Sequence, residues 1–549
     1  MQPPLAGLTR KNLGRELLAG VTLIAIAIPL NIGYAQIAGL PATAGLYALI
    51  VPTLIWALMT SSRQLVASPD AAAAALVASS LGGLATAGSA GYATMALAQA
   101  VIGGVLFLLM GVFKLGFLAN FLSKPILVGF VGGLALDILV SQIAKMLGVH
   151  IDSGGEFVEK LTGLITGLGT INLWSAIIAV GSLVVLIFGR KLARAVPWAL
   201  IVLIVATVIV VLTHADKVGV DVLGEVPAGP PALTWPMLSW QEWFALIPSA
   251  IALTMVTTAE GLLVSRSYGE KRHYPTNANR DLFAFGFANL AAGASGTFTV
   301  GSSTSRTAAM DAAGSRTQLP SVVLAVGTFL LLMFGTALLT DIPSPAIGAI
   351  VAFAVVPLLG IADFRSMWKL DRFEFVIGIA CFAVTLFVGA IPGILVAFVL
   401  ALINMAKRAA APAIDVLVSE PETGELAAET EPGGVTAPGV VVVRMAAPLF
   451  FANGEVFAGA IRSAVAAAGG SDAVHDVVID MEAVTDVDVT GSESFESVRE
   501  WLEQQSIGLS FSRVRSGAKA RLARFGVVED GDTVYRTNRE AVTALAKSE

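Results

Sequence analysis

The stretch at residues 65–80, LVASPDAAAAALVASS, decides the fold because it begins a short helix among much longer apolar runs. Its apolar part has about a dozen residues, fewer than the ~20 that a helix needs to cross a bilayer core. Ser68, Pro69 and Asp70 predict the helix start, with Ser68 as the cap, Pro69 at the first position and Asp70 in the first turn. The sequence therefore predicts an extended segment that leads into a half-length helix.

The composition around this stretch is that of a membrane protein. The chain has 549 residues, of which 56% are hydrophobic and only 13% are charged, whereas soluble domains carry about 25% charged residues. Apolar runs of roughly 20 residues recur up to about residue 410. A large soluble core would need amphipathic outer helices, and these are nearly absent from that part of the sequence. The first residues show no signal-peptide pattern, so none is expected.

Three regions follow from the change in composition along the chain. Residues 1–410 are expected to form the membrane domain, with repeats at about 12–215 and 240–410. Residues 411–439 are acidic and rich in Pro and Gly, which predicts a linker or mobile loop. Residues 440–549 alternate apolar strands with helical periodicity and predict a small α/β domain.

Basic residues cluster in alternate connections between the apolar runs, and this alternation sets the topology. The connections with few basic residues contain only Lys145, Lys160 and Lys217. The connections with many basic residues are expected in the cytoplasm, together with both ends of the membrane domain and the α/β domain. The alternation holds only if residues 65–80 and a segment between Asp281 and Arg316 both cross the membrane. This predicts about fourteen transmembrane segments, in two seven-segment halves of opposite orientation that divide near residue 225.

The second half contains a counterpart to the opening stretch at residues 301–314, GSSTSRTAAMDAAG. Paired, interrupted short segments at corresponding positions indicate a transporter binding site. Two helix N-termini that point at one cavity favour an anion, since each carries about half a positive charge and unpaired N–H groups. The side chains expected to contribute hydroxyl donors and one cation are Ser68, Ser303, Thr304, Ser305 and Arg306.

Other roles remain open for several of these residues. Ser68 and Ser305 also suit simple helix caps. Arg306 also suits an ion pair with a structural acid such as Asp311 or Glu260. An acid in the first turn competes with an anion for the helix dipole, so Asp70 is expected to point away or to be protonated.

Several stretches resemble SulP (sulfate permease-type) anion transporters, at residues 19–48, 61–79, 258–269, 277–293 and 301–319. Residues 448–457 and 477–491 resemble the STAS domain that such transporters carry, and the resemblance extends to a bacterial proton-coupled fumarate transporter. It implies two inverted seven-helix repeats arranged as a core and a gate, a site between the third and tenth helices, a homodimer and alternating access. It also implies that Tyr34 lines the site and that Glu260 lies near it.

One departure from the family pattern bears on the substrate. Family members often have Gln after the first-helix proline, where this chain has Leu30 after Pro29. The change makes the pocket more apolar, which weakens the case for sulfate and leaves room for an organic anion. Glu260 lies inside an apolar run and is a candidate to bind a proton with the anion and release it inside. An ion pair with Arg306 or a helix-packing hydrogen bond is the alternative role for Glu260.

In the α/β domain, Asp488 and Thr490 lie in the motif DVDVTG, near which stand-alone STAS proteins carry a phosphorylated Ser or Thr. A helix-capping role for both residues is preferred over a regulatory one. No phosphate-binding glycine loop, metal cluster or catalytic set appears, so no enzyme, cofactor, metal or nucleic-acid partner is expected.

Together with the family resemblance, the sequence predicts a multi-pass secondary transporter of the bacterial inner membrane; the resemblance implies a proton as the coupling ion and a small dicarboxylate such as fumarate as the substrate. Four alternatives remain: an inorganic-anion transporter or exchanger for sulfate, bicarbonate or chloride; a nucleobase permease; an anion channel; and a STAS-based membrane signalling protein.

Overall fold

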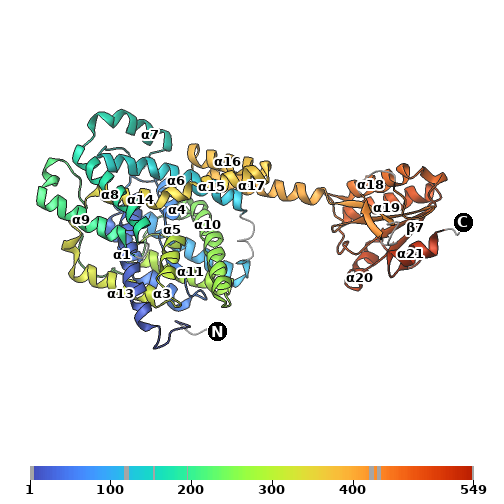
Figure 1. Ribbon diagram of the computed structural model, residues 1–549, viewed down its shortest axis with the longest axis horizontal. Helices are drawn as coiled ribbons and strands as arrows, with labels where there is room; N and C mark the ends of the chain where they lie inside the picture. The colour runs from blue at the N-terminus through green and yellow to red at the C-terminus, as the bar shows by residue number, and fades with distance from the viewer. Residues whose placement is uncertain are drawn as a thin grey trace. The chain divides into compact units, whose positions relative to one another are not determined.

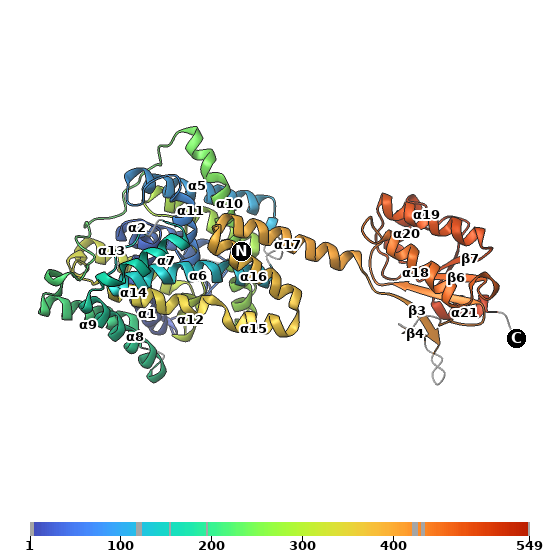
Figure 2. The same ribbon diagram turned by 90° about the horizontal axis from the view of Figure 1, so that it is seen from above.

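The computed structural model describes residues 5–116, 123–152, 155–193, 196–419, 426–429 and 434–546. The chain forms two compact units, Met1–Ala401 and Leu402–Glu549. The first unit is helical apart from two short strands, and the second contains a mixed sheet covered by helices. Figures 1 and 2 show both units in two views.

The first unit repeats one order of elements in its two halves (Figures 1 and 2). The elements of the first half are α1 (Leu13–Ile37), α2 (Ala42–Ala48), α3 (Val51–Met59), β1 (Val66–Ser68), α4 (Ala71–Leu81), α5 (Ala90–Val112), α6 (Lys124–Leu147), α7 (Phe157–Thr166), α8 (Leu173–Leu192) and α9 (Trp198–Thr213). Those of the second half are α10 (Trp240–Arg272), α11 (Ala278–Ala294), β2 (Gly301–Ser303), α12 (Thr304–Ala312), α13 (Leu319–Phe334), α14 (Ser344–Val355), α15 (Ile361–Leu370), α16 (Arg372–Phe387) and α17 (Ala390–Ala410).

Three features relate the halves. A three-residue strand followed by a short helix occupies the third place of each half, as β1–α4 and β2–α12. Each half also contains a 10-residue helix with one apolar face between its fifth and sixth long segments. This helix is α7, between α6 and α8, in the first half and α15, between α14 and α16, in the second. The corresponding strands β1 and β2 pair antiparallel, which is the relation that halves of opposite orientation require. The predicted two-repeat membrane fold is therefore confirmed.

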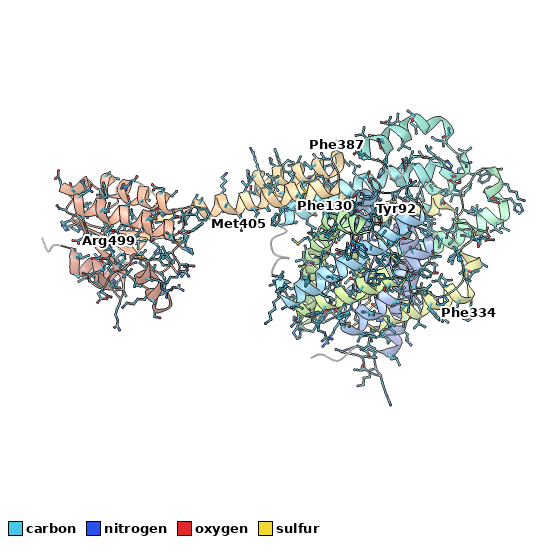
Figure 3. The ribbon with its side chains drawn as sticks, turned by 180° about the vertical axis from the view of Figure 1, so that it is seen from behind. Tyr92, Phe130, Phe334, Phe387, Met405 and Arg499 are labelled. Carbon is cyan, nitrogen blue, oxygen red and sulfur yellow. The ribbon has the colours of Figure 1, made fainter. Side chains whose placement is uncertain are left out.

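Length and composition support the membrane assignment. Seven helices or helix pairs in the described residues are long and apolar enough to cross a bilayer. The shorter apolar helices are α4, α9 and α13. Large apolar side chains also cover the outside of the unit, such as Leu212 at 74% exposure and Phe334 at 83%. Figure 3 shows Phe334 and Phe387 at the edge of this unit and Tyr92 and Phe130 inside it.

Contacts divide the first unit into two lobes. The core lobe contains α1–α5 and α10–α13, and the gate lobe contains α6–α9 and α14–α16. Small residues let helices approach closely within each lobe, as membrane helices require. In the core lobe, a Cβ on Gly104 of α5 would lie 2.7 Å from the backbone nitrogen of Leu290 in α11. In the gate lobe, Gly129 of α6 packs against Gly378 of α16.

We expect Gly129→Ala to lower the free energy of unfolding by about 1–3 kcal/mol, the usual cost of overpacking. A Cβ there would lie 2.3 Å from the Gly378 carbonyl oxygen and 2.9 Å from Cβ of Cys381. Gly181→Ala in α8 is the matched control, because its added Cβ would meet no atom within 4 Å from outside the neighbouring backbone of its own helix. Thermal unfolding of both purified variants checks the prediction, and equal melting temperatures would contradict it.

The second unit is a six-stranded sheet with the order β4-β3-β5-β6-β7-β8. Its elements are β3 (Ile414–Ser419), β4 (Leu426–Glu429), β5 (Val440–Met445), α18 (Gly454–Ala467), β6 (Asp476–Asp480), α19 (Val489–Gln504), β7 (Gly508–Ser512), α20 (Ser516–Arg524), β8 (Thr533–Tyr535) and α21 (Asn538–Leu545). The strands β5 to β8 run parallel. Alternate residues of β5 face opposite sides: Val441 and Val443 pack with α18, α19 and α20, and Val440 and Val442 pack with α21.

The predicted linker at residues 411–439 is wrong for two segments. Residues 414–419 form β3, which pairs antiparallel with β5, and residues 426–429 form β4, which pairs with β3. The apolar side chain of Leu417 in β3 is fully buried beside Val442. Burial of this face and the ladder to β5 explain why these residues form strands despite the acidic sequence that follows them. Residues 420–425 and 430–433 of the predicted linker lie outside the described residues.

Candidate functional site

The two short strands bring the two half-helices together. β1 and β2 pair in the register Val66↔Ser303 and Ser68↔Gly301. α4 begins three residues after β1, and α12 begins directly after β2. The N-terminal ends of both half-helices therefore lie at one place in the core lobe, as the sequence predicted. Because each end carries about half a positive charge, the place attracts negative charge.

Side chains of neighbouring helices pair with the backbone of the extended segments, which a membrane interior requires. Trp56 Nε1 of α3 donates to the Leu65 carbonyl at 2.8 Å. In the second half, the amide of Asn289 in α11 binds both backbone groups of Val300, each at 3.0 Å. Asn289 is not among the predicted site residues, although an amide within an apolar helix is the available signal in the sequence.

Asp70, not Ser68, caps α4, so the predicted cap is corrected. The Asp70 backbone is extended, with φ −121° and ψ 178°, and its Oδ1 accepts from the Ala73 backbone N–H at 2.7 Å. Pairing of β1 with β2 keeps the chain extended through Ser68, so the helix begins two residues later than predicted. Ser68 is fully buried, and its Oγ has no hydrogen-bond partner among the described residues.

Arg306 is a fully buried cation at the start of α12. Its Nε donates to Ser303 Oγ at 2.8 Å, and Nη2 donates to the Pro69 carbonyl before α4. The guanidinium Cζ lies 5.7 Å from the ring centre of Tyr34 in α1, a cation–π contact. Its Nη1 has no partner within the described part of the chain. A buried donor without a partner costs free energy, so Nη1 is a ready ligand for an anion.

The alternative ion pair of Arg306 with Asp311 is wrong. Asp311 binds Lys271 at 3.0 Å, Arg272 at 2.7 Å and Arg316 at 3.4 Å. Within the described ranges, no ion pair joins Arg306 to Glu260 either. The free guanidinium nitrogen is thus available to a ligand.

The remaining candidate residues separate into two groups. Ser303 is buried and caps α12 by accepting from the Arg306 backbone N–H at 3.4 Å. Thr304 and Ser305 are exposed, and Ser305 is not the helix cap. The structure thus brings Tyr34, Ser68, Ser303 and Arg306 together and leaves Thr304 and Ser305 on an accessible face. Sequence reasoning missed Ser302, whose buried Oγ also lacks a partner among the described residues.

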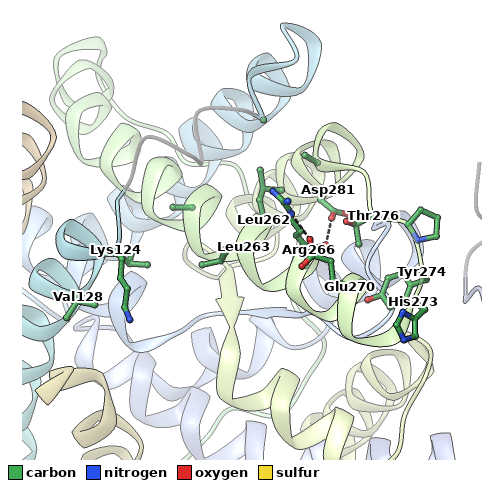
Figure 4. A pocket seen from close by; sticks show the side chains of 17 residues that line it. Lys124, Val128, Leu262, Leu263, Arg266, Glu270, His273, Tyr274, Thr276 and Asp281 are labelled. Atoms are coloured by element: carbon green, nitrogen blue, oxygen red, sulfur yellow. Dashed lines mark hydrogen bonds and ion pairs between the residues drawn. The ribbon is translucent and has the colours of Figure 1, made fainter. Parts of the chain in front are cut away.

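Glu260 lies on α10, partly exposed. Its neighbour Ala259 lines a cavity of about 1270 Å³ between α10 of the core lobe and α6 of the gate lobe. Figure 4 shows Lys124 and Val128 on one side of this cavity and Leu263 and Arg266 on the other. The lining includes two basic side chains, Lys124 and Arg266, which form ion pairs with Asp363 and Glu270.

A cavity separates α6 from α10, but the corresponding two helices of the other repeats are in contact. By element order, α1 and α14 correspond to α10 and α6, yet α1 packs against α14. A Cβ on Gly33 of α1 would lie 2.3 Å from Val351 and 3.3 Å from Ile347 of α14. Near the same end, Lys145 Nζ of α6 donates to Gln36 Oε1 of α1 at 3.1 Å. The two lobes are therefore closed at one end and open at the other.

The candidate regulatory residues of the second unit lie at a helix start. Asp488 caps α19 by accepting from the Gly491 backbone N–H at 2.7 Å, and it also accepts from the Phe451 N–H at 3.0 Å. Thr490 is exposed in the first turn of α19. The preferred capping role is thus found for Asp488 but not for Thr490, which lies inside the helix.

A polytopic membrane unit in which two half-helices meet at a buried arginine is an architecture typical of anion transporters. Residues 13–381 match the Sulfate permease family, and residues 434–541 match the STAS domain. The chain belongs to the sulfate permease family and carries a C-terminal STAS domain.

Relatives with known names agree with this membership. A probable sulfate transporter of Mycobacterium tuberculosis (strain CDC 1551 / Oshkosh) is 33% identical over 541 residues, which cover 98% of this chain and 96% of the relative. A chloroplastic sulfate transporter 4.1 of Arabidopsis thaliana is 28% identical over 534 residues, 94% of this chain and 77% of the relative.

Solved structures share the fold. Murine Solute Carrier 26 family member A9, an anion transporter in the inward-facing state, matches with a TM-score of 0.87 and 22% identity over 98% of this chain and 92% of its own. The transmembrane domain of a cyanobacterium bicarbonate transporter, BicA, matches with a TM-score of 0.63 and 22% identity over 72% of this chain and 98% of its own.

Proposed function

We propose that this protein is a proton-coupled symporter of a small dicarboxylate such as fumarate, working by alternating access. The observation that carries the proposal is the buried Arg306, whose Nη1 lacks a partner among the described residues at the junction of two half-helix N-termini. Such a site suits a compact oxyanion that accepts hydrogen bonds from all sides.

Two further observations support the finer parts of the proposal. Leu30 is 5% exposed in α1, four residues before Tyr34, so an apolar side chain replaces the amide often found there in the family. An apolar wall favours a substrate with a carbon skeleton over sulfate. Glu260 beside the cavity supplies a carboxyl group that can carry a proton with the anion.

The open and closed lobe contacts support alternating access. The lining of the cavity between α6 and α10 includes Lys124 and Arg266, for which the positive-inside rule favours the cytoplasmic side. The membrane proposed is the bacterial inner membrane, with the N-terminus and the STAS domain in the cytoplasm. Motion of one lobe against the other would close this cavity and open the α1–α14 contact. The homodimer stays a prediction, which native mass spectrometry of the purified protein would check.

Sulfate is the second candidate substrate, because the relatives at 33% and 28% identity are named sulfate transporters. Both candidates are divalent oxyanions of similar charge. An uptake assay with proteoliposomes therefore compares labelled fumarate, succinate, sulfate, bicarbonate and chloride, each with and without an inward proton gradient. Saturable fumarate uptake that needs the gradient supports the proposal. Sulfate uptake that ignores pH would replace it with an inorganic-anion transporter.

Glu260→Gln is expected to lower the gradient-driven accumulation of the anion. At an inward gradient of two pH units, the loss of one coupled proton lowers the accumulation ratio by about 100-fold, since each coupled proton contributes a factor of ten per pH unit. Glu270→Gln is the matched control, because Glu270 lines the same cavity but forms a surface ion pair with Arg266 at 2.9 Å. Accumulation at the wild-type level in Glu260→Gln would remove Glu260 from the coupling.

A further inference from the structure

We propose that Asp70 accepts a proton when the anion binds, so that Asp70 and Glu260 together carry the coupling protons. The inference rests on the proton-coupled function proposed above and adds a second proton-accepting residue to the same site.

Asp70 lies at the junction of the two half-helices. One carboxylate oxygen caps α4 through the Ala73 N–H at 2.7 Å. The other faces β2 and α10: the position of a Cβ on Gly301 lies 3.3 Å from Asp70 Oδ2 and 3.3 Å from Thr257 Oγ1. Thr257 is one turn before Glu260 on α10. Asp70 thus presents its second oxygen to the helix that carries the other acid.

The charged and titratable groups that interact electrostatically with Asp70 come from three elements. They are Tyr34 of α1, Glu260 of α10 and Arg306 of α12. With both acids ionised and Arg306 charged, these groups carry one net negative charge. A divalent anion would raise this excess to three negative charges inside a membrane protein, where uncompensated charge is very costly. Each proton that binds to one of the two acids removes one of these negative charges.

Ionised Asp70 also competes with the anion for the same positive groups. Its carboxylate already occupies the N-terminus of α4 and lies in the field of Arg306. Protonation removes this competing charge, while the carbonyl oxygen of the neutral acid still accepts from the Ala73 N–H. The positive field then becomes available to the ligand.

Independent atoms at this junction point to a ligand. Arg306 Nη1 and Ser68 Oγ are buried without partners among the described residues, and both residues are 0% exposed. An anion that binds these donors lies beside Asp70. Uptake of two protons with a dianion makes the moving cargo neutral, which is the least costly charge to carry through a low-dielectric interior.

Asp70→Asn tests the inference, since asparagine is an equally good helix cap that binds no proton at this position. The probes are fumarate and sulfate, in proteoliposomes that hold the full-length protein. The slope of log accumulation ratio against the pH gradient is expected to fall by about one in Asp70→Asn relative to wild type. Uptake by the variant should also fall when the interior is made negative, because its cargo now carries net charge.

Two controls separate the possible failures. Wild-type uptake that does not respond to the proton gradient would overturn the proposed function itself. A gradient response in wild type that Asp70→Asn leaves unchanged would overturn only the role of Asp70. Stabilisation of detergent-purified protein against heating by each anion provides a readout that needs no transport. It should weaken as the pH rises in wild type and weaken less steeply in both Asp70→Asn and Asp70→Ser, which keep only Glu260 as a proton acceptor; a decline as steep as in wild type would contradict the inference.

Discussion

Arg306→Gln will reduce kcat/KM for anion uptake by about 100- to 1000-fold, equivalent to about 3–4 kcal/mol. The side chain is 0% exposed, and Nη1 is the one nitrogen of its guanidinium group that lacks a partner among the described residues. Glutamine keeps a polar group near Ser303 but removes the positive charge. The loss should appear for every anion that the protein carries, because the charge attracts all of them.

Arg306→Lys distinguishes charge from geometry. Lysine restores the charge but not the forked donors that hold both Ser303 Oγ and the Pro69 carbonyl, so only part of the activity should return. The matched control is Arg190→Gln, which removes a cation from α8 in the gate lobe, where Arg190 lies over the ring of Phe353. Uptake by the three variants is compared at equal amounts of folded protein. Wild-type uptake in Arg306→Gln would remove the anion site from this junction.

Leu127→Cys/Leu263→Cys will cross-link only when the cavity between α6 and α10 closes, and the cross-linked protein will not transport. Both residues line this cavity, Leu127 on α6 and Leu263 on α10. Leu127 lies two residues after Pro125 of α6, as Ile347 lies two residues after Pro345 of α14. Because Ile347 contacts α1 in the closed pair, its counterpart is expected to contact α10 when the lobes exchange their open ends.

The experiment uses mild oxidation with and without anion and proton gradient. A disulfide needs Cα atoms within about 7 Å, so the pair reports closure directly. Cys381 can stay in place, because it is fully buried and is the only cysteine of the sequence. The single variants Leu127→Cys and Leu263→Cys are the controls. Rapid cross-linking without loss of transport would argue against movement of these two helices.

The sequence was sufficient to predict the paired half-helices, and local spacing explains why. Short Ala-rich segments after a Pro or a run of hydroxyl residues stand out against apolar runs twice as long. The alternation of strands and helices predicted for residues 440–549 is also confirmed, with β5, β6 and β7 among the strands. In each case the residue pattern that predicts the element lies within the element itself.

The errors lie where a distant segment decides the local structure. Ser68 and Asp70 are both good caps, and pairing of β1 with a strand more than 200 residues away selects Asp70. The β3 sequence IDVLVS alternates like a strand, yet only its ladder to β5 distinguishes it from the linker around it. Likewise, a sequence does not reveal that Asp311 is already bound by three basic residues and so cannot neutralise Arg306.

The ladder between β1 and β2 has a thermodynamic consequence. It ties the two half-helix N-termini into one body, so both halves of the anion site travel together within the core lobe. Direct contacts to the anion then have the same strength whichever side the site faces. Under the proposed proton coupling, a difference in affinity between the two sides would then arise from protonation of the two carboxyl groups and not from loss of the contacts themselves. The ladder thus means that release of the anion would not require the site to be dismantled.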